Sequence, residues 1–216
     1  MDADGLTGLT FACAMGVEER AAWRLGPTVR LGLGAVNGIP SAGRLVSFGI
    51  AGALRPGLGV GTVIDATRVV DESGDVLWEG GPLGIASARR GTILGASRIV
   101  DHPDERARLH SRTGADAVDM ESGPLARSGR LAGCVRAISD TPERQLGGLA
   151  EAVKPNGDTD YLGLARVFLR APRETLRAVA DARRALKSLA EASLAMPTER
   201  SGGLAAAPAD PGSGEP

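Results

Sequence analysis

Three carboxylates lie where an apolar segment of the chain ends, which is an unusual place for charged side chains. Glu18 follows the apolar run Leu9–Met15 within CAMGVEER, Glu121 lies in AVDMES, and Asp140 directly follows the run GCVRAIS. Carboxyl groups act as general acids and bases, and they accept hydrogen bonds from ligand hydroxyl groups. The pattern therefore predicts a small-molecule site assembled from distant parts of the chain.

Each acid also has an ordinary structural explanation, and the local sequence leaves both explanations open. Asp140 or Thr141 could cap a helix whose first turn holds Pro142. Glu18 could be an acid in the first turn of a helix, where the helix dipole favours it. Glu121 could lie on a solvated helix face, although its apolar neighbours indicate partial burial, and a buried carboxylate needs hydrogen-bond donors.

Short apolar runs and helical patterns mix along the chain. The runs rich in Val and Ile predict buried strands at Leu9–Met15, Val29–Val36, Arg44–Gly52, Gly61–Val70, Gly91–Val100 and Gly133–Ser139. Helical patterns cover Glu18–Leu25, Pro103–Ser111, Asp116–Gly129 and Asp160–Ala195. We therefore predict a three-layer α/β/α fold around a central mixed, largely parallel sheet. Ligands of such sheets bind beyond the carboxyl ends of strands, where the three acids fall.

Length and composition bound the classes of function. The 216 residues predict one domain over residues 8–195 and a disordered tail over 196–216, which is rich in Pro, Gly and Ala. A net charge of −1 gives no general attraction to nucleic acid. No charged and apolar leader opens the chain, and no apolar run approaches the ~20 residues that span a bilayer, so we expect a cytoplasmic protein.

The few cysteines and histidines predict no metal site and no cofactor chemistry. Cys13 and Cys134 each lie in an apolar run, which favours buried thiols over a disulfide or a reactive site. His102 and His110 have no partners at metal-ligand spacing. The Gly-rich stretch 48–61 could cradle an anion or let a sugar approach the backbone. It does not fit the dinucleotide fingerprint, which argues against a nicotinamide-dependent dehydrogenase.

Four segments in order, CAMGVEE, SFGIAGAL…GVG, AVDMES and VRAISD, resemble the nucleoside phosphorylase/nucleosidase superfamily. Within it they look like 5′-methylthioadenosine/S-adenosylhomocysteine nucleosidase. VSFGIAGAL, GADAVDMESG, VRAISD and the Arg-rich C-terminal helix look closest to the hopanoid-associated phosphorylases, which remove adenine from adenosylhopane. The resemblance covers Thr10 to Ala195 with interruptions.

The resemblance implies catalytic roles for two acids. Asp140, protonated and oriented by Ser139, would donate to N7 of the leaving adenine. Glu18 would align and deprotonate the attacking water. The departing base is neutralised in this way, and general acid catalysis contributes about 10²–10⁴-fold. The site must therefore keep Asp140 protonated near neutral pH by desolvating it.

The resemblance also implies substrate-binding residues. Met120 and Glu121 would bind the ribose, with the carboxylate accepting from its hydroxyl groups. The backbone of Val100 would contact the adenine edge, and Ala51 and Gly52 in SFGIAGAL would line the site.

The sequence departs from the family pattern at the phosphate site. Hydrolytic members carry Ser at the position of Ile50, and bacterial purine phosphorylases carry Arg and Ser at the positions of Ser47 and Ile50. Without these phosphate-binding side chains we expect water as the nucleophile, although an Arg elsewhere could bind phosphate instead. The arginines considered for this are Arg20, Arg55 and Arg89.

Other departures concern the adenine site and the connections of the sheet. An Asp expected near adenine is Ser97 here. Only NGIPSAG stands where the family has a crossover helix, and residues 71–90 also lack a helix-sized piece. A parallel crossover needs a dozen or more residues. The two explanations are a rearranged sheet and a trimmed, inactive relative.

The expected function is cleavage of the N-glycosidic bond of an adenine nucleoside, with a lipid 5′ substituent as in adenosylhopane. The alternatives are a non-catalytic nucleoside-binding relative and hydrolysis of methylthioadenosine or adenosylhomocysteine. We expect a homodimer that binds no nucleic acid.

The C-terminal helical pattern raises a separate question about membranes. Its apolar positions are Leu164, Val167, Phe168, Leu176, Val179, Leu186 and Leu189. Its cations between residues 166 and 187 predict either a solvated basic face or weak contact with an anionic membrane surface.

Overall fold

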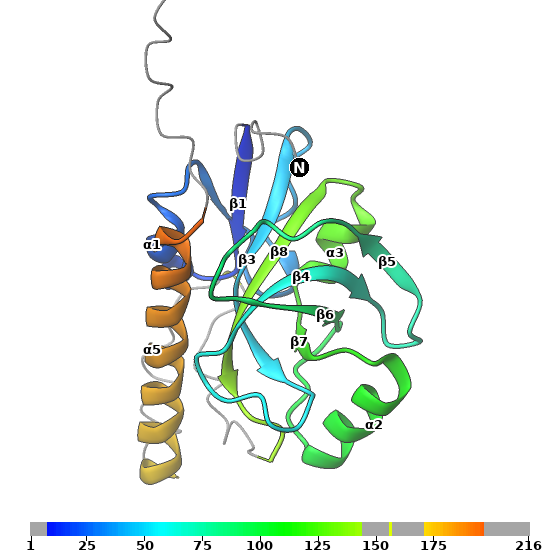
Figure 1. Ribbon diagram of the computed structural model, residues 1–216, viewed down its shortest axis with the longest axis vertical. Helices are drawn as coiled ribbons and strands as arrows, with labels where there is room; N and C mark the ends of the chain where they lie inside the picture. The colour runs from blue at the N-terminus through cyan, green and yellow to red at the C-terminus, as the bar shows by residue number, and fades with distance from the viewer. Residues whose placement is uncertain (1–7, 144–155, 157–170, 197–216) are drawn as a thin grey trace, which may run out of the picture.

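The computed structural model describes residues 8–143, 156 and 171–196 of the chain (Figure 1). The strands are β1 (Leu9–Cys13), β2 (Thr28–Arg30), β3 (Arg44–Ala53), β4 (Val63–Val70), β5 (Val76–Glu79), β6 (Arg89–Gly95), β7 (Ala117–Asp119) and β8 (Leu131–Asp140). The helices are α1 (Gly16–Ala22), the 3₁₀ turn η1 (Leu33–Ala35), α2 (Pro103–Thr113), α3 (Ser122–Arg127) and α5 (Pro172–Leu194).

The sheet is mixed and curls onto itself. β3 pairs with both β7 and β8, β8 pairs with β4, β4 with β6, and β6 with β7, so these five strands close into a ring. β1 and β2 extend the sheet from β3 through parallel pairs, and β5 extends it from β4 as an antiparallel edge. The predicted α/β fold with a mixed, largely parallel sheet is confirmed, and its curvature brings the ends of β3, β6, β7 and β8 together.

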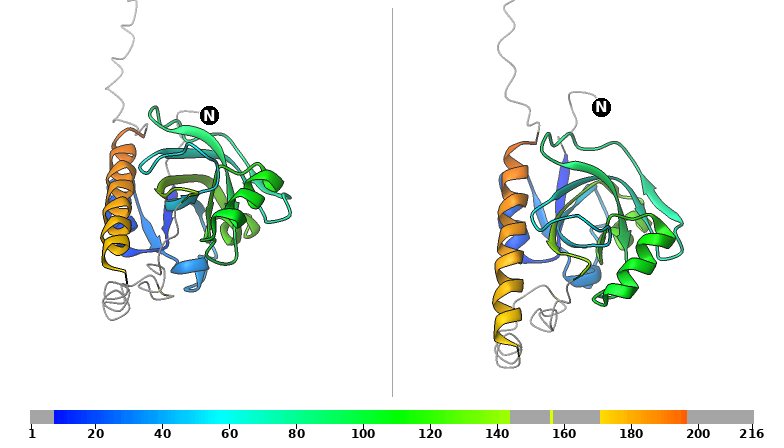
Figure 2. Two further views of the ribbon diagram at one scale, coloured as in Figure 1. Left: turned by 90° about the horizontal axis from the view of Figure 1, so that it is seen from below. Right: turned by 60° about the horizontal axis from the view of Figure 1, so that its bottom comes forward.

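Helices cover the sheet from two sides. α1 and α5 pack against each other, α1 also packs against β1, β2 and β3, and α5 packs against β8, whereas α3 packs against β4, β5 and β6. Figures 1 and 2 show α5 standing along one side of the strands and α2 lying on the opposite side. The core is dominated by small and branched side chains, and its aromatic contact is the edge-to-face pair Phe11–Phe48, with ring centroids 5.8 Å apart.

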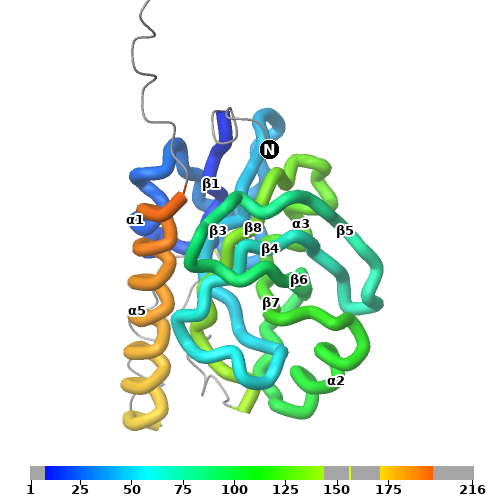
Figure 3. Tube along the Cα trace, viewed as in Figure 1, coloured from blue at the N-terminus to red at the C-terminus, as the bar shows by residue number. Residues whose placement is uncertain are grey.

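The structure accommodates both connections that lack a crossover helix. β2 ends at Arg30 and β3 begins at Arg44, so residues 31–43 connect two strands that both run parallel to β1. This length satisfies the dozen residues that a parallel crossover requires, because β2 is shorter than the sequence indicated. Residues 71–88 form the β4–β5 hairpin and an extended return to β6, which can be followed in Figure 3.

The helix predicted over Asp116–Gly129 is wrong in its first part. Residues Ala117–Asp119 form β7, which pairs with β3 and β6. The αL conformation of Gly114 ends α2, and the Asp119 carboxylate then accepts from the Ser122 N–H at 3.0 Å and starts α3. Pairing on both edges therefore outweighs the helical pattern of this segment.

The edge strand β5 was missed by the sequence reasoning, although local hydrogen bonds mark its turn. The Asp71 Oδ1 atom accepts from the Ser73 and Asp75 N–H groups at 2.8 and 3.0 Å. After β5, the buried Asp65 carboxylate holds the return segment by accepting from three successive N–H groups. These belong to Leu83, Gly84 and Ile85, at 2.9, 2.9 and 3.2 Å.

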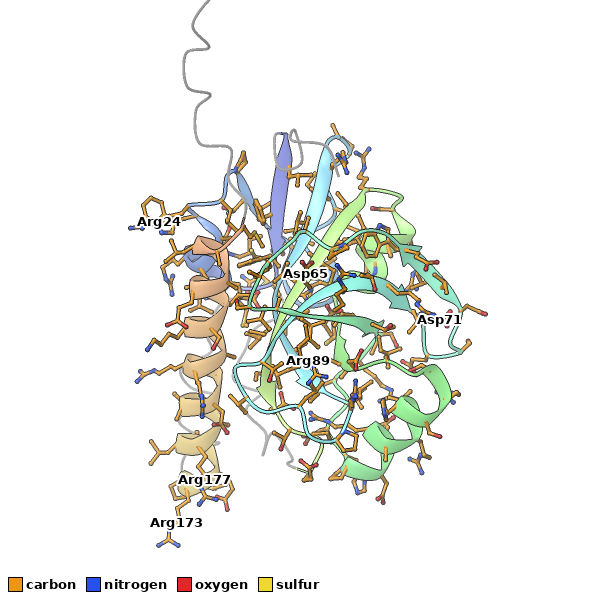
Figure 4. All side chains as sticks on the ribbon, viewed as in Figure 1. Arg24, Asp65, Asp71, Arg89, Arg173 and Arg177 are labelled. Atoms are coloured by element: carbon orange, nitrogen blue, oxygen red, sulfur yellow. The ribbon has the colours of Figure 1, made fainter. Side chains whose placement is uncertain are left out.

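Helix α5 carries the predicted basic face but not the whole predicted apolar face. Leu189 is buried, whereas Leu176 is 60% exposed, which contradicts its predicted place in the apolar stripe. Ala185 and Ala192 are buried instead, because small residues allow the helix to approach α1 and β8 closely. Arg173 and Arg177 lie at the N-terminal end of α5 in Figure 4. The predicted part of this helix over residues 160–170 lies outside the described residues.

Two further points concern the chain end and membranes. Met196, where the predicted tail begins, is buried, and residues 197–216 lie outside the described residues. Within the described ranges, none of the helices has the length and apolar character needed to cross a membrane.

Candidate active site

A cavity of about 680 Å³ opens at the ends of β3, β6, β7 and β8, with α1 at its base and α5 as one wall. Its lining includes every residue that the sequence nominated for the site: Glu18, Ala51, Gly52, Val100, Met120, Glu121, Ser139 and Asp140. A volume of this size is typical of small-molecule sites. The structure thus brings together segments that are more than 100 residues apart, and Ser97 is exposed outside the lining.

Asp140 ends β8 and is 7% exposed. Its Oδ1 atom accepts from the Ser139 hydroxyl at 2.7 Å, and the same hydroxyl lies 3.2 Å from the Ala51 carbonyl oxygen. Its Oδ2 atom is buried and in ion-pair contact with the Arg106 guanidinium, although the two groups are not aligned as a hydrogen bond. Desolvation was expected to keep Asp140 protonated, but the structure adds a cation that the sequence reasoning did not anticipate.

Glu18 is buried in the first turn of α1 and accepts from three backbone N–H groups. The Oε2 atom accepts from Ala14 and Met15 at 2.8 and 2.9 Å, and the Oε1 atom accepts from Ile50 at 2.9 Å. Burial raises the pKa of Glu18 above its ordinary value, against the opposing effects of Arg136 and these N–H groups. Its orientation is therefore fixed by the backbone, and its raised pKa makes it a better proton acceptor than an exposed carboxylate.

Glu121 sits at the N-cap of α3 and is buried rather than solvated. Its Oε1 atom accepts from the Gly34 N–H at 2.9 Å, which ties η1 to the site. Burial, followed by the negative charge of Asp119, raises the pKa of Glu121 to about 7. The side chain can therefore exchange a proton near neutral pH when a ligand hydroxyl group donates to it.

A buried guanidinium, Arg136, stands behind these acids. Its Nε atom pairs with Asp119, and its Nη2 atom donates to the Ser47 hydroxyl at 2.6 Å and lies 3.8 Å from Glu121 Oε2. Burial acts to lower the pKa of Arg136, but Asp119 and the neighbouring acids raise it overall, so it stays charged. Ser47, expected to mark a lost phosphate grip, instead helps to hold this cation.

The Nη1 atom of Arg136 finds no hydrogen-bond acceptor among the described residues. It lies against Gly49 on β3, beside the Oε1 atom of Glu18, and a Cβ at residue 49 would overlap both groups. A buried donor without a partner is costly, and Arg136 itself is outside the cavity lining.

Sequence reasoning missed Arg106, Asp119 and Arg136, and the arginines it offered as alternative phosphate ligands lie elsewhere. Arg20, Arg55 and Arg89 are outside the cavity lining, and Arg55 pairs with Asp116 at 3.2 Å. A signal existed for Arg136 and Asp119, because both are charges inside otherwise apolar runs, VRAIS and AVDM. No such signal marks Arg106, which lies in the polar sequence PDERARLHSR.

The two thiols are buried, as predicted. Burial raises the pKa of Cys134 to about 12, and burial followed by the charge of Glu18 raises the pKa of Cys13 as well. Neither thiol is therefore poised for nucleophilic chemistry.

Comparison with known proteins agrees with this fold. A sequence profile described as the Phosphorylase superfamily matches residues 79–160, which contain β6, β7 and β8. No curated protein matches the chain by sequence.

Solved structures give the same answer over most of the chain. Native futalosine hydrolase of Helicobacter pylori strain 26695 aligns with a TM-score of 0.55 and 14% identity, over 88% of this chain and 97% of that chain. The 5′-methylthioadenosine/S-adenosylhomocysteine nucleosidase of Helicobacter pylori aligns with a TM-score of 0.55 and 15% identity, over 89% of this chain and 98% of that chain. The 5′-methylthioadenosine/S-adenosylhomocysteine nucleosidase of Neisseria meningitidis, in complex with methylthio-immucillin-A, aligns with a TM-score of 0.54 and 18% identity, over 85% of this chain and 97% of that chain.

The chain therefore has the α/β fold of these solved nucleosidases and hydrolases. The predicted resemblance to the nucleoside phosphorylase/nucleosidase superfamily is confirmed, and its structural neighbours include nucleosidases. The closer resemblance to hopanoid-associated phosphorylases stays a prediction.

Proposed function

We propose that the protein cleaves the N-glycosidic bond of an adenine nucleoside. The observation that carries this proposal is the convergence of Glu18, Glu121 and Asp140 on one cavity. Two of the acids, Glu18 and Glu121, surround the buried guanidinium of Arg136, and Asp140 lies at a separate cation, Arg106.

The chemistry divides between two parts of the cavity. Asp140 delivers a proton to the leaving base, with Ser139 holding the carboxyl group, and Val100, Ala51 and Gly52 lie beside it around the base. Glu121 accepts from ribose hydroxyl groups, and Met120 packs on the sugar. Bond breaking places positive charge on the ribose, which the acids around Arg136 stabilise electrostatically.

Water is the nucleophile in this proposal, and Glu18 is its base. The backbone N–H of Ile50 donates to the Glu18 carboxylate, and the Ile50 side chain has no donor for an oxyanion. Phosphate needs several convergent donors and positive charge, and the three acids around Arg136 (Glu18, Asp119 and Glu121) oppose a dianion there.

The 5′ substituent is proposed to be apolar, as in adenosylhopane. The cavity lining includes the apolar residues Leu33, Ile99, Ala178 and Ala182, and Ile99 is 42% exposed. Exposed cations on α5, including Arg183 and Arg184, would allow weak contact with an anionic membrane that holds such a lipid. A homodimer with a cytoplasmic location also remains a prediction.

The test incubates the purified protein separately with adenosine, 5′-deoxyadenosine, 5′-methylthioadenosine and adenosylhopane, with and without inorganic phosphate. We expect adenine and a free ribose derivative, fastest with the apolar 5′ substituents. Turnover that requires phosphate and yields ribose-1-phosphate would show that phosphate, and not water, is the nucleophile. Nucleoside binding without adenine release would favour the alternative, a non-catalytic nucleoside-binding protein.

A further inference from the structure

Arg106 ties three parts of the candidate site together from α2. Its side chain is 1% exposed, and its Nε atom donates to the Val100 carbonyl at 3.0 Å. Its Nη1 atom donates to the Thr141 carbonyl at 3.0 Å, and its Nη2 atom is in ion-pair contact with Asp140 Oδ2. One guanidinium thus joins α2 to the segment after β6 and to the end of β8.

The pair is close to the backbone of β3, and a glycine makes room for it. A Cβ at Gly52 would lie 3.0 Å from Asp140 Oδ2 and 3.1 Å from Arg106 Nη2. Such contacts are tighter than real Cβ atoms normally make, so a side chain at residue 52 would push the pair apart. Gly52 therefore supports the ion pair as well as lining the cavity.

The two oxygen atoms of Asp140 have different surroundings. Oδ2 faces a guanidinium that can only donate, so it acts as an acceptor and cannot hold a proton there without conflict. Oδ1 faces the Ser139 hydroxyl, which has a second acceptor in the Ala51 carbonyl. Because a hydroxyl group rotates, Ser139 can donate to Oδ1 when Asp140 is charged and to Ala51 when Oδ1 carries a proton.

We propose that Arg106 is a positioning residue that reserves Oδ2 for the negative charge and leaves Oδ1 as the oxygen that exchanges a proton with the nucleobase. This assignment rests on the proposed function. As the glycosidic C–N bond breaks, its electron pair moves to the base, and the Oδ1 proton forms the new N–H bond. Asp140 becomes a carboxylate against Arg106, while water adds to the sugar carbon and gives its proton to Glu18.

The experiment compares two leaving groups in the same proteins. Adenine from 5′-methylthioadenosine needs a proton as it leaves, whereas 4-nitrophenolate from 4-nitrophenyl riboside departs as an anion. We expect Arg106→Gln to lower the ratio of adenine release to nitrophenolate release by about 10²-fold, within the range of general acid catalysis. Arg106→Lys should restore part of the ratio, because a cation can still meet Oδ2. Arg108→Gln, on the exposed side of the same helix, is the matched control and should leave the ratio unchanged.

A double-mutant cycle separates positioning from general support of the fold. If Arg106 acts through Asp140, adding Arg106→Gln to Asp140→Asn should lower adenine release no further. Equal loss with both leaving groups, or a further loss in the Asp140→Asn background, overturns the assignment while leaving the proposed function intact. A wild-type protein that cleaves neither substrate refutes the proposed function itself, and the assignment falls with it.

Discussion

Replacing Glu121 by Gln should stabilise the protein at alkaline pH, because the native site holds this carboxylate at an energetic cost. Glu121 is 5% exposed, and its pKa rises from 4.5 to about 7 through burial first and then the charge of Asp119. Each pKa unit corresponds to about 1.4 kcal/mol, so the ionised side chain costs the native state about 3 kcal/mol.

The sign of the pH dependence follows from proton binding in the two states. Between about pH 4.5 and 7, the native protein holds this proton more tightly than the unfolded chain. Wild-type stability should therefore fall as pH rises through this window and stay low above it. Gln keeps the acceptor for the Gly34 N–H but carries no charge. The raised pKa already includes the opposing attraction of Arg136, 3.8 Å away, so the expected gain is at most about 3 kcal/mol at pH 8.

Urea unfolding at pH 5, 6, 7 and 8 measures this difference directly. Glu121→Gln should match the wild type near pH 5 and exceed it increasingly toward pH 8. The exposed Glu79→Gln is the control and should keep the wild-type pH dependence. If Glu121→Gln is no more stable than the wild type at pH 8, Glu121 is not held at a raised pKa and the reasoning fails.

Two further predictions concern buried carboxylates with different tasks. Glu18→Gln should lower adenine release by about 10²-fold or more, because an amide cannot take the proton of water, and a loss smaller than tenfold would remove Glu18 from the base role. Asp65→Asn should lower the free energy of unfolding by about 1–3 kcal/mol, because the amide group meets at least one of the three N–H donors of the return segment. The exposed Asp75→Asn is the comparison for Asp65, and equal effects of the two substitutions would contradict the structural role.

The sequence was informative where chemistry and local pattern coincide. The eight nominated residues line one cavity because each lies at the end of a strand or beside one, where the curled sheet brings those ends together. The missing crossover helices were identified by comparison with the family pattern. The early end of β2 at Arg30 leaves enough chain for an extended crossover without a helix.

The remaining errors share a physical cause, which is tertiary pairing that local patterns do not contain. The segment Ala117–Asp119 reads as helix in isolation but pairs with strands on both sides. Arg106 looks like a solvated helix residue, yet its four polar contacts are with segments before and after it in the chain. Leu176 fits an apolar stripe, but α5 faces the domain with Ala185, Leu189 and Ala192 instead.

The most direct test of the central claim compares adenine release by the wild type and Asp140→Asn under single-turnover conditions, with 5′-methylthioadenosine as substrate. Asn is nearly isosteric with Asp, and its side-chain oxygen at residue 140 can still accept from Ser139, so folding and nucleoside binding should persist. The account predicts adenine release by the wild type and a loss of about 10²–10⁴-fold in the variant. Release by Asp140→Asn within tenfold of the wild type, or no release by the wild type from any adenine nucleoside, would contradict it.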